Sequence, residues 1–196
     1  DDMVQTTGCA ALWNLANDRR IVPALKDAGG IKAIVVAMRN HVANLMLQKY
    51  GCGVLLIFAK ADFSNGDAIR EAGGIKAIID AMNRHVENED MQLGGSGAVN
   101  TLAVDPRNRS VIREAGGIEA IIMAMQRHRM VVGVQRNGRG ALGNLTGDPI
   151  DSAPDVDTMQ RPIVANAVRK TGWLVRMLRE SAAILVIGLV IVPRRR

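Results

Sequence analysis

The stretch that decides the fold is AGGIKAIIDAMNRH at residues 72–85, because the chain contains it three times. Residues 28–41 read AGGIKAIVVAMRNH, and residues 115–128 read AGGIEAIIMAMQRH. The three copies begin 44 and 43 residues apart. A constant period of this length predicts an array of stacked structural repeats rather than one globular core.

Each copy predicts one amphipathic helix. Ile75, Ile78, Ile79 and Met82 fall at i, i+3, i+4 and i+7, which is one face of an α-helix. The same face recurs in the other two copies, at Ile31, Ile34, Val35 and Met38 and at Ile118, Ile121, Ile122 and Met125. The double glycine near the start of each copy predicts a sharp turn after a short first helix, expected at 66–72 and 108–115.

A second phrase predicts another helix in each repeat. It reads VQTTGCAALWNLA from Val4, LQKYGCGVLLIFA from Leu47, MQLGGSGAVNTLA from Met91 and VQRNGRGALGNLT from Val134. In the third copy we expect Met91, Ala98, Val99 and Leu102 to be buried. The glycines that recur in the phrase predict a close approach of another helix, at Gly8, Gly51, Gly95 and Gly138. One copy of the repeat is a residue longer, and we assign that residue to a loop at 60–65.

The chain resembles the armadillo family in three features. It has three helices per repeat, a Gly-Gly-Ile opening of the second helix and a third helix of the pattern V-Q-x-x-G-x-x-A-L-x-N-L. The resemblance implies an all-α fold, a right-handed α-solenoid of three-helix armadillo repeats. It covers residues 1–148, as a partial copy at 1–28 and copies at 29–72, 73–115 and 116–148. Residues 149–160, rich in Pro, Asp and Ser, are expected to form a loop or linker. Residues 161–196 are interpreted as a degenerate C-terminal capping repeat or as a basic, apolar tail.

Composition narrows the classes of partner. Apolar residues make up 48% of the chain but aromatic residues only 3%, as suits helices packed through aliphatic side chains. The net charge is +6, but the repeats show no basic stripe with interleaved aromatic residues, so no nucleic-acid partner is expected. Cys9 and Cys52 occupy the same position of successive repeats and are expected to be buried, reduced thiols. A cytoplasmic location follows, with the nucleus as an alternative.

No group of residues predicts catalysis. His41, His85 and His128 each end a second helix, so stacking places them about 10 Å apart, too far to share a zinc ion. We expect them to stabilise the helix ends instead. The phrase GGSG at 94–97 lies within a third helix and lacks the Lys-Ser/Thr of a phosphate-binding loop. The sequence therefore predicts no enzyme, no cofactor and no metal site.

The resemblance implies a concave groove lined by the third helices, where family members that bind peptides carry a ladder of asparagines. Asn14 and Asn144 match the ladder position, and Ile57 and Thr101 interrupt it. Trp13 is expected to lie off the groove, packed between helices. The same helical face adds four further candidates for partner binding: Lys49, Tyr50, Arg136 and Asn137. Within it, Met46, Tyr50 and Ile57 could form an apolar hot spot; alternatively they pack or face solvent while a partner docks elsewhere.

The function expected from these features is a non-catalytic scaffold that binds a peptide or helix of another protein in the groove. A second reading rests on the apolar run at 182–192 and the three arginines that follow it. Eleven residues are too short to span a bilayer as a helix, so the run would form either a buried cap or an interfacial anchor. In the second case residues 173–196 would attach a membrane-surface adaptor to anionic lipid.

Overall fold

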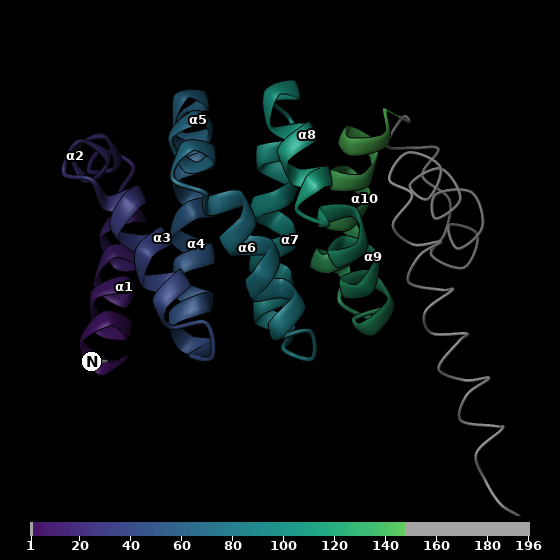
Figure 1. Cartoon of the computed structure of the whole chain (residues 1–196), viewed down its shortest axis with the longest axis horizontal. Helices are drawn as coiled ribbons and strands as arrows, with labels where there is room; N and C mark the ends of the chain where they lie inside the picture. The colour runs from purple at the N-terminus through teal and green to yellow at the C-terminus, as the bar shows by residue number, and fades with distance from the viewer. Residues whose placement is uncertain (1, 148–196) are drawn as a thin grey trace, which may run out of the picture. The chain divides into compact units, whose positions relative to one another are not determined.

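The structure is a computed structural model that describes residues 2–147, which belong to one compact unit. The linker expected at 149–160 and the cap or tail expected at 161–196 lie outside the described residues. Within the described part the chain forms ten α-helices and no strand, so the all-α prediction is confirmed there (Figure 1). None of these helices is long and apolar enough to cross a membrane.

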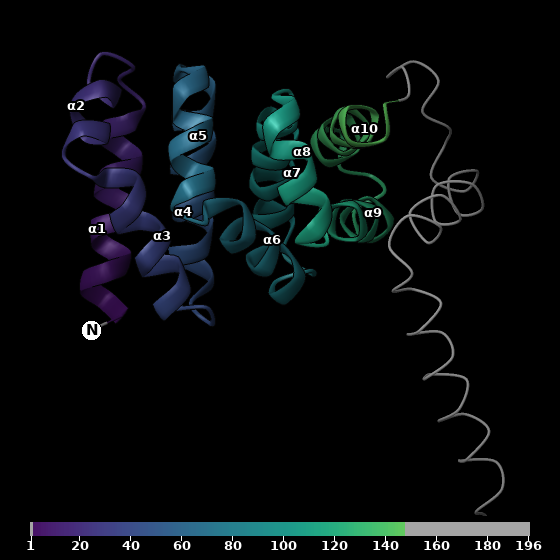
Figure 2. The same cartoon turned by 45° about the horizontal axis from the view of Figure 1, so that its top comes forward.

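The helices follow the predicted three-helix order. The first helices of the repeats are short, and they are α2 (Val22–Asp27), α5 (Phe63–Glu71) and α8 (Pro106–Glu114). The second helices have eleven residues each, and they are α3 (Gly30–Asn40), α6 (Gly74–Arg84) and α9 (Gly117–Arg127). The third helices are α1 (Asp2–Ala16), α4 (Leu45–Ala61), α7 (Glu89–Ala103) and α10 (Val132–Thr146). Equivalent helices of successive repeats lie side by side in chain order (Figures 1 and 2).

The double glycines make the turn between first and second helices, as predicted. Gly73 has φ +77°, a left-handed conformation that side-chain-bearing residues rarely adopt. At Gly74 the limit is space, because a Cβ atom there would lie 2.7 Å from Ile69 Cγ2. The first glycine thus turns the chain and the second lets the two helices touch.

The second and third helices of a repeat meet where a methionine covers a glycine. A Cβ atom at Gly95 would lie 2.4 Å from Cγ of Met82, whose side chain is only 1% exposed. Equivalent contacts join Gly51 to Met38 and Gly138 to Met125. The prediction that these glycines mark close helix packing is confirmed for α4, α7 and α10. At Gly8 on α1 an added Cβ would meet nothing within 4 Å, because no second helix packs there in the described residues.

The recurring glutamine has a structural role that the sequence pattern did not reveal. Gln92 Nε2 donates to two backbone oxygens at the end of α6, that of Met82 at 2.9 Å and that of His85 at 3.1 Å. Gln48 and Gln135 make the same pair of hydrogen bonds in their own repeats. Each glutamine therefore binds carbonyls at the C-terminal end of its second helix, which have no partner within the helix.

Two predictions need correction. The loop expected at 60–65 is wrong, because α4 continues to Ala61 and Asp62 alone separates it from α5. α4 is two residues longer than α7, and the link after it is one residue shorter than the link between α7 and α8, which together account for the one extra residue of this repeat. On α9, Ile122 was expected to be buried but is only half-buried. Its counterpart Ile79 contacts the second glycine of the next repeat's turn, and no such turn follows α9 in the described residues.

Candidate binding groove

All four third helices contribute to one open pocket with a volume of about 670 Å³, which we call the groove. It is lined by Trp13 from α1, by Met46, Lys49, Tyr50, Gly53, Leu56 and Lys60 from α4, by Asp90, Leu93, Gly94, Gly97, Asn100 and Thr101 from α7, and by Arg136 and Asn137 from α10. The lining combines five apolar or aromatic side chains with seven polar or charged ones and three glycines. A concave pocket of this size that brings apolar and polar groups together is typical of a binding site.

An aromatic pair forms the end of the groove at α1. The ring centroids of Trp13 and Tyr50 lie 5.7 Å apart with the planes tilted by 43°, a favourable geometry for two aromatic rings. Trp13 lines the groove and is 39% exposed, so the expectation that it lies off the groove is wrong, whereas its packing between α1 and α4, against Gly53, agrees with the prediction. Rings that expose both an apolar face and a polar edge are frequent anchors in protein interfaces.

Three glycines of the third helices receive side chains from the preceding repeat, and two of them line the groove. A Cβ atom at Gly53 of α4 would lie 3.0 Å from Trp13 Nε1, and one at Gly97 of α7 would lie 3.3 Å from Leu56 Cδ2. In the same way Asn100 covers Gly140 of α10, where a Cβ would lie 2.6 Å from Asn100 Oδ1. Trp13, Leu56 and Asn100 hold equivalent positions in their repeats, eight residues after the recurring glutamine. They form a row along the groove that we call the ladder row.

The ladder row lies one residue before the asparagine ladder that the resemblance implied. At the predicted position in α7, Thr101 donates its hydroxyl hydrogen to the Gly97 carbonyl of its own helix at 2.9 Å. The amide of the neighbouring Asn100 lines the groove and makes no hydrogen bond in residues 2–147. An unpaired side-chain amide has an N–H donor and a C=O acceptor. It can therefore donate to the carbonyl of a peptide bond and accept from its N–H group.

The predicted binding residues divide between the groove and its surroundings. Five of them line it: Lys49, Tyr50, Thr101, Arg136 and Asn137. Asn137 also donates to the Leu93 carbonyl at 3.3 Å, so it links α10 to α7. Asn14, Ile57 and Asn144 do not line the pocket. Sequence reasoning missed Leu56, Lys60 and Asn100. Two of these residues, Leu56 and Asn100, could have been predicted from the sequence, because each occurs in register with a glycine of the next repeat.

The groove carries more positive than negative charge. Lys49 Nζ lies 2.7 Å from Asp90 Oδ2, and this pair joins α4 to α7. Lys60 and Arg136 also line the groove, and neither has an ion-pair or hydrogen-bond partner among the described residues. Asp90 is the only carboxylate in the lining and is already paired. Two cations are therefore left for a ligand.

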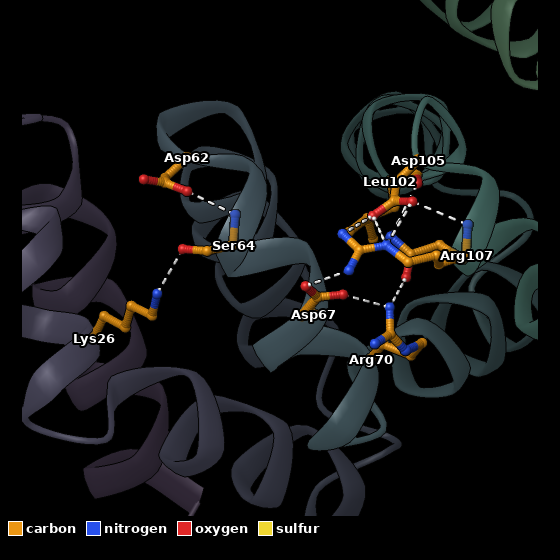
Figure 3. A network of polar contacts seen from close by, with 9 residues as sticks. Lys26, Asp62, Ser64, Asp67, Arg70, Leu102, Asp105 and Arg107 are labelled. Carbon is orange, nitrogen blue, oxygen red and sulfur yellow. Dashed lines mark hydrogen bonds and ion pairs between the residues drawn. The ribbon is translucent and has the colours of Figure 1, made fainter.

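Polar contacts join the first helices of successive repeats (Figure 3), beside a second pocket that shares Lys60 and Thr101 with the groove. Asp105 accepts from Arg107 N at 2.9 Å and caps α8, and the hydrogen bonds from Arg107 lower the pKa of this carboxyl group. Asp67 bridges the repeats by pairing with Arg70 at 2.6 Å and with Arg107 at 3.0 Å. Arg70 also donates to the buried Asn108 Oδ1 at 2.9 Å.

The preceding junction is less complete. There Lys26 stands at the position of Arg70 and donates to Ser64 Oγ at 2.8 Å (Figure 3). Asn65 corresponds to Asn108, and its Oδ1 atom is buried with no hydrogen-bond partner. These contacts describe a structural network between repeats rather than a reactive site. Among the described residues there is no group of three or more His, Cys, Asp or Glu side chains arranged to hold a metal ion.

The histidines and cysteines have structural surroundings. His85 and His128 stand at the ends of α6 and α9, but their side chains reach the preceding repeat: Nε2 of His85 contacts the Val42 carbonyl at 3.0 Å, and Nε2 of His128 contacts the Val86 carbonyl at 2.8 Å. They therefore link repeats in addition to marking helix ends. Cys9 and Cys52 are free and buried, as predicted, and burial raises the pKa of both thiols.

Comparison with known proteins shows a likeness of fold and no family. No family model matches the sequence, and no curated protein matches it. The structure resembles the crystal structure of an engineered protein from the Northeast Structural Genomics Consortium, with a TM-score of 0.63 and 22% sequence identity. The match covers 86% of this chain and 64% of that one. At this identity the likeness concerns the fold alone.

Proposed function

We propose that residues 2–147 form an armadillo-type, right-handed solenoid whose groove binds an extended segment of another protein. The module is non-catalytic in this proposal and acts as part of a cytoplasmic or nuclear scaffold, a setting that suits two buried free thiols. The observation that carries the proposal is the single groove built by all four third helices, with Trp13, Tyr50 and the unpaired amide of Asn100 in its lining.

These residues supply the two kinds of contact that an extended peptide needs. The half-exposed Trp13–Tyr50 pair gives an apolar anchor site, and burial of such rings dominates the free energy of many protein interfaces. The Asn100 amide can pair with a peptide bond whatever the ligand's side chains are. Because the ladder row passes from α1 to α7, a ligand can contact successive repeats in turn.

The test is selection from a random dodecapeptide phage library on the immobilised protein, followed by fluorescence polarisation with the selected peptides. We expect Trp13→Ala and Tyr50→Ala each to weaken binding by roughly 10-fold or more, as loss of a buried aromatic anchor does. Phe63→Ala is the matched control, because Phe63 is 66% exposed on α5 and does not line the groove. Enrichment of no peptide, or equal loss in all three variants, would refute the groove assignment.

A further inference from the structure

The lining of the groove also points to the chemistry of the ligand. We infer that the segment bound in the groove carries at least two carboxylates, spaced to reach Lys60 and Arg136 on either side of α7, with apolar residues between them. This inference rests on the proposed function and adds the class of peptide. It is carried by charge complementarity and by the positions of the two unpaired cations.

Charge is the first step. The lining contains three cations, Lys49, Lys60 and Arg136, and one carboxylate, that of Asp90. The Lys49–Asp90 pair at 2.7 Å neutralises one cation. Neither Lys60 nor Arg136 has a polar partner within residues 2–147. A basic ligand would meet two uncompensated cations, whereas a ligand carboxylate gains a charge-assisted hydrogen bond with each.

Position is the second step. Lys60 stands at the C-terminal end of α4, and Arg136 lies near the start of α10. The helix α7 lies between them, because α4 and α10 both pack on α7 (Figure 1). Two interhelical steps of about 8–10 Å separate such cations, and an extended chain advances about 3.3 Å per residue. The offset of Lys60 and Arg136 along the helix axes adds to this span, so the ligand's carboxylates lie at least about five residues apart.

The apolar side chains that line the groove predict apolar residues between the two carboxylates of the ligand. Met46 and Leu93 are 44% and 38% exposed, and Leu56 is half-buried. These side chains face the groove from α4 and α7. A polynucleotide also bears negative charge, but it binds single-stranded through bases stacked on aromatic rings. Trp13 and Tyr50 contact each other with their ring planes tilted by 43°, and the other large apolar side chains of the lining are aliphatic, so an acidic peptide fits better.

The experiment extends the library selection to two charge-reversed proteins. Lys60→Glu/Arg136→Glu changes the groove, and Lys32→Glu/Arg84→Glu makes the same change in net charge at exposed positions on α3 and α6, outside the groove. We expect the natural sequence and the control to select peptides enriched in Asp and Glu at least about five residues apart. The groove variant should lose that enrichment. Circular dichroism confirms that each protein is folded.

Synthetic peptides then give the magnitude. Replacement of the acidic residues of a selected peptide by Asn and Gln should weaken binding by about 10-fold or more at 50 mM salt, and the difference should shrink at 300 mM as charges are screened. Selection of neutral or basic peptides that still require Trp13 would overturn the inference and leave the proposed function standing. Absence of any selected peptide would overturn both. Tighter binding of a fluorescein-labelled oligothymidylate than of any peptide would assign the cations to nucleic acid instead.

Discussion

A matched pair of glycine substitutions tests how the array is held together. Gly8 and Gly95 occupy the same position of α1 and α7, and both lie inside a helix. Replacing glycine by alanine in a helix interior gains about 1 kcal/mol from helix propensity alone. At Gly8 nothing lies within 4 Å of the added Cβ, so we expect Gly8→Ala to stabilise the protein by about that amount.

At Gly95 the same methyl group meets the core. Its Cβ would lie 2.4 Å from Met82 Cγ and 2.8 Å from Sδ, whereas carbon atoms in contact sit about 3.5–4.0 Å apart. To restore a normal contact distance, Met82 would have to move by roughly 1 Å or more. Because Met82 is 1% exposed, the close-packed core around it leaves little room for that movement. Overpacking of this kind costs about 1–3 kcal/mol. We therefore expect Gly95→Ala to fall about 1–3 kcal/mol below Gly8→Ala in free energy of unfolding.

The assay is urea denaturation followed by circular dichroism at 222 nm, with both variants and the parent measured together. A double-mutant cycle isolates the contact, because in a Met82→Ala background the obstructing atoms are gone and Gly95→Ala should become neutral or stabilising. Two results would refute the reasoning: equal stabilisation by Gly8→Ala and Gly95→Ala, or the same effect of Gly95→Ala with and without Met82.

Three further expectations concern buried or paired groups. Lys26→Arg should raise the free energy of unfolding by about 1 kcal/mol in urea titrations, because a guanidinium at this position can donate to the unpartnered Asn65 Oδ1; no gain would contradict the comparison of the two junctions. Hydrogen bonds from Arg107 lower the pKa of Asp105, so its contribution to stability is present above the unfolded pKa of about 3.9 and is lost as pH falls through the lower folded value. Asp105→Asn should therefore lower the thermal midpoint at pH 7 and reduce its decline below pH 4; identical pH profiles would contradict this. Cys52 is fully buried with a raised pKa, so a thiol reagent should modify it only as fast as the array opens, and rapid labelling of native protein would contradict the packing.

The repeat and its buried faces could be predicted from the sequence because both depend on local periodicity. The spacing of Ile75 and Met82 defines one face of a helix, and that face is buried in the structure. The groove depends instead on how one repeat stacks on the next, which periodicity within a helix does not report. This is why Trp13 was expected off the groove and why Thr101 was favoured over Asn100. The informative signal spans two repeats, and it is the pairing of Trp13 with Gly53.

The two sides of the array differ in how fully their polar groups are satisfied, and this difference supports a binding role for the groove. Between α5 and α8, Arg70, Asp67 and Arg107 form a network across the repeats, so these side chains have few hydrogen-bonding groups left for a ligand. Along the groove, Lys60 and Arg136 have no partner in the described residues, and large apolar side chains stay exposed. In a repeat array each unit contacts only its neighbours, so both sides could be stabilised by similar networks. The groove instead retains exposed apolar and unpaired charged groups, and a ligand that bridges successive repeats would bury and pair them.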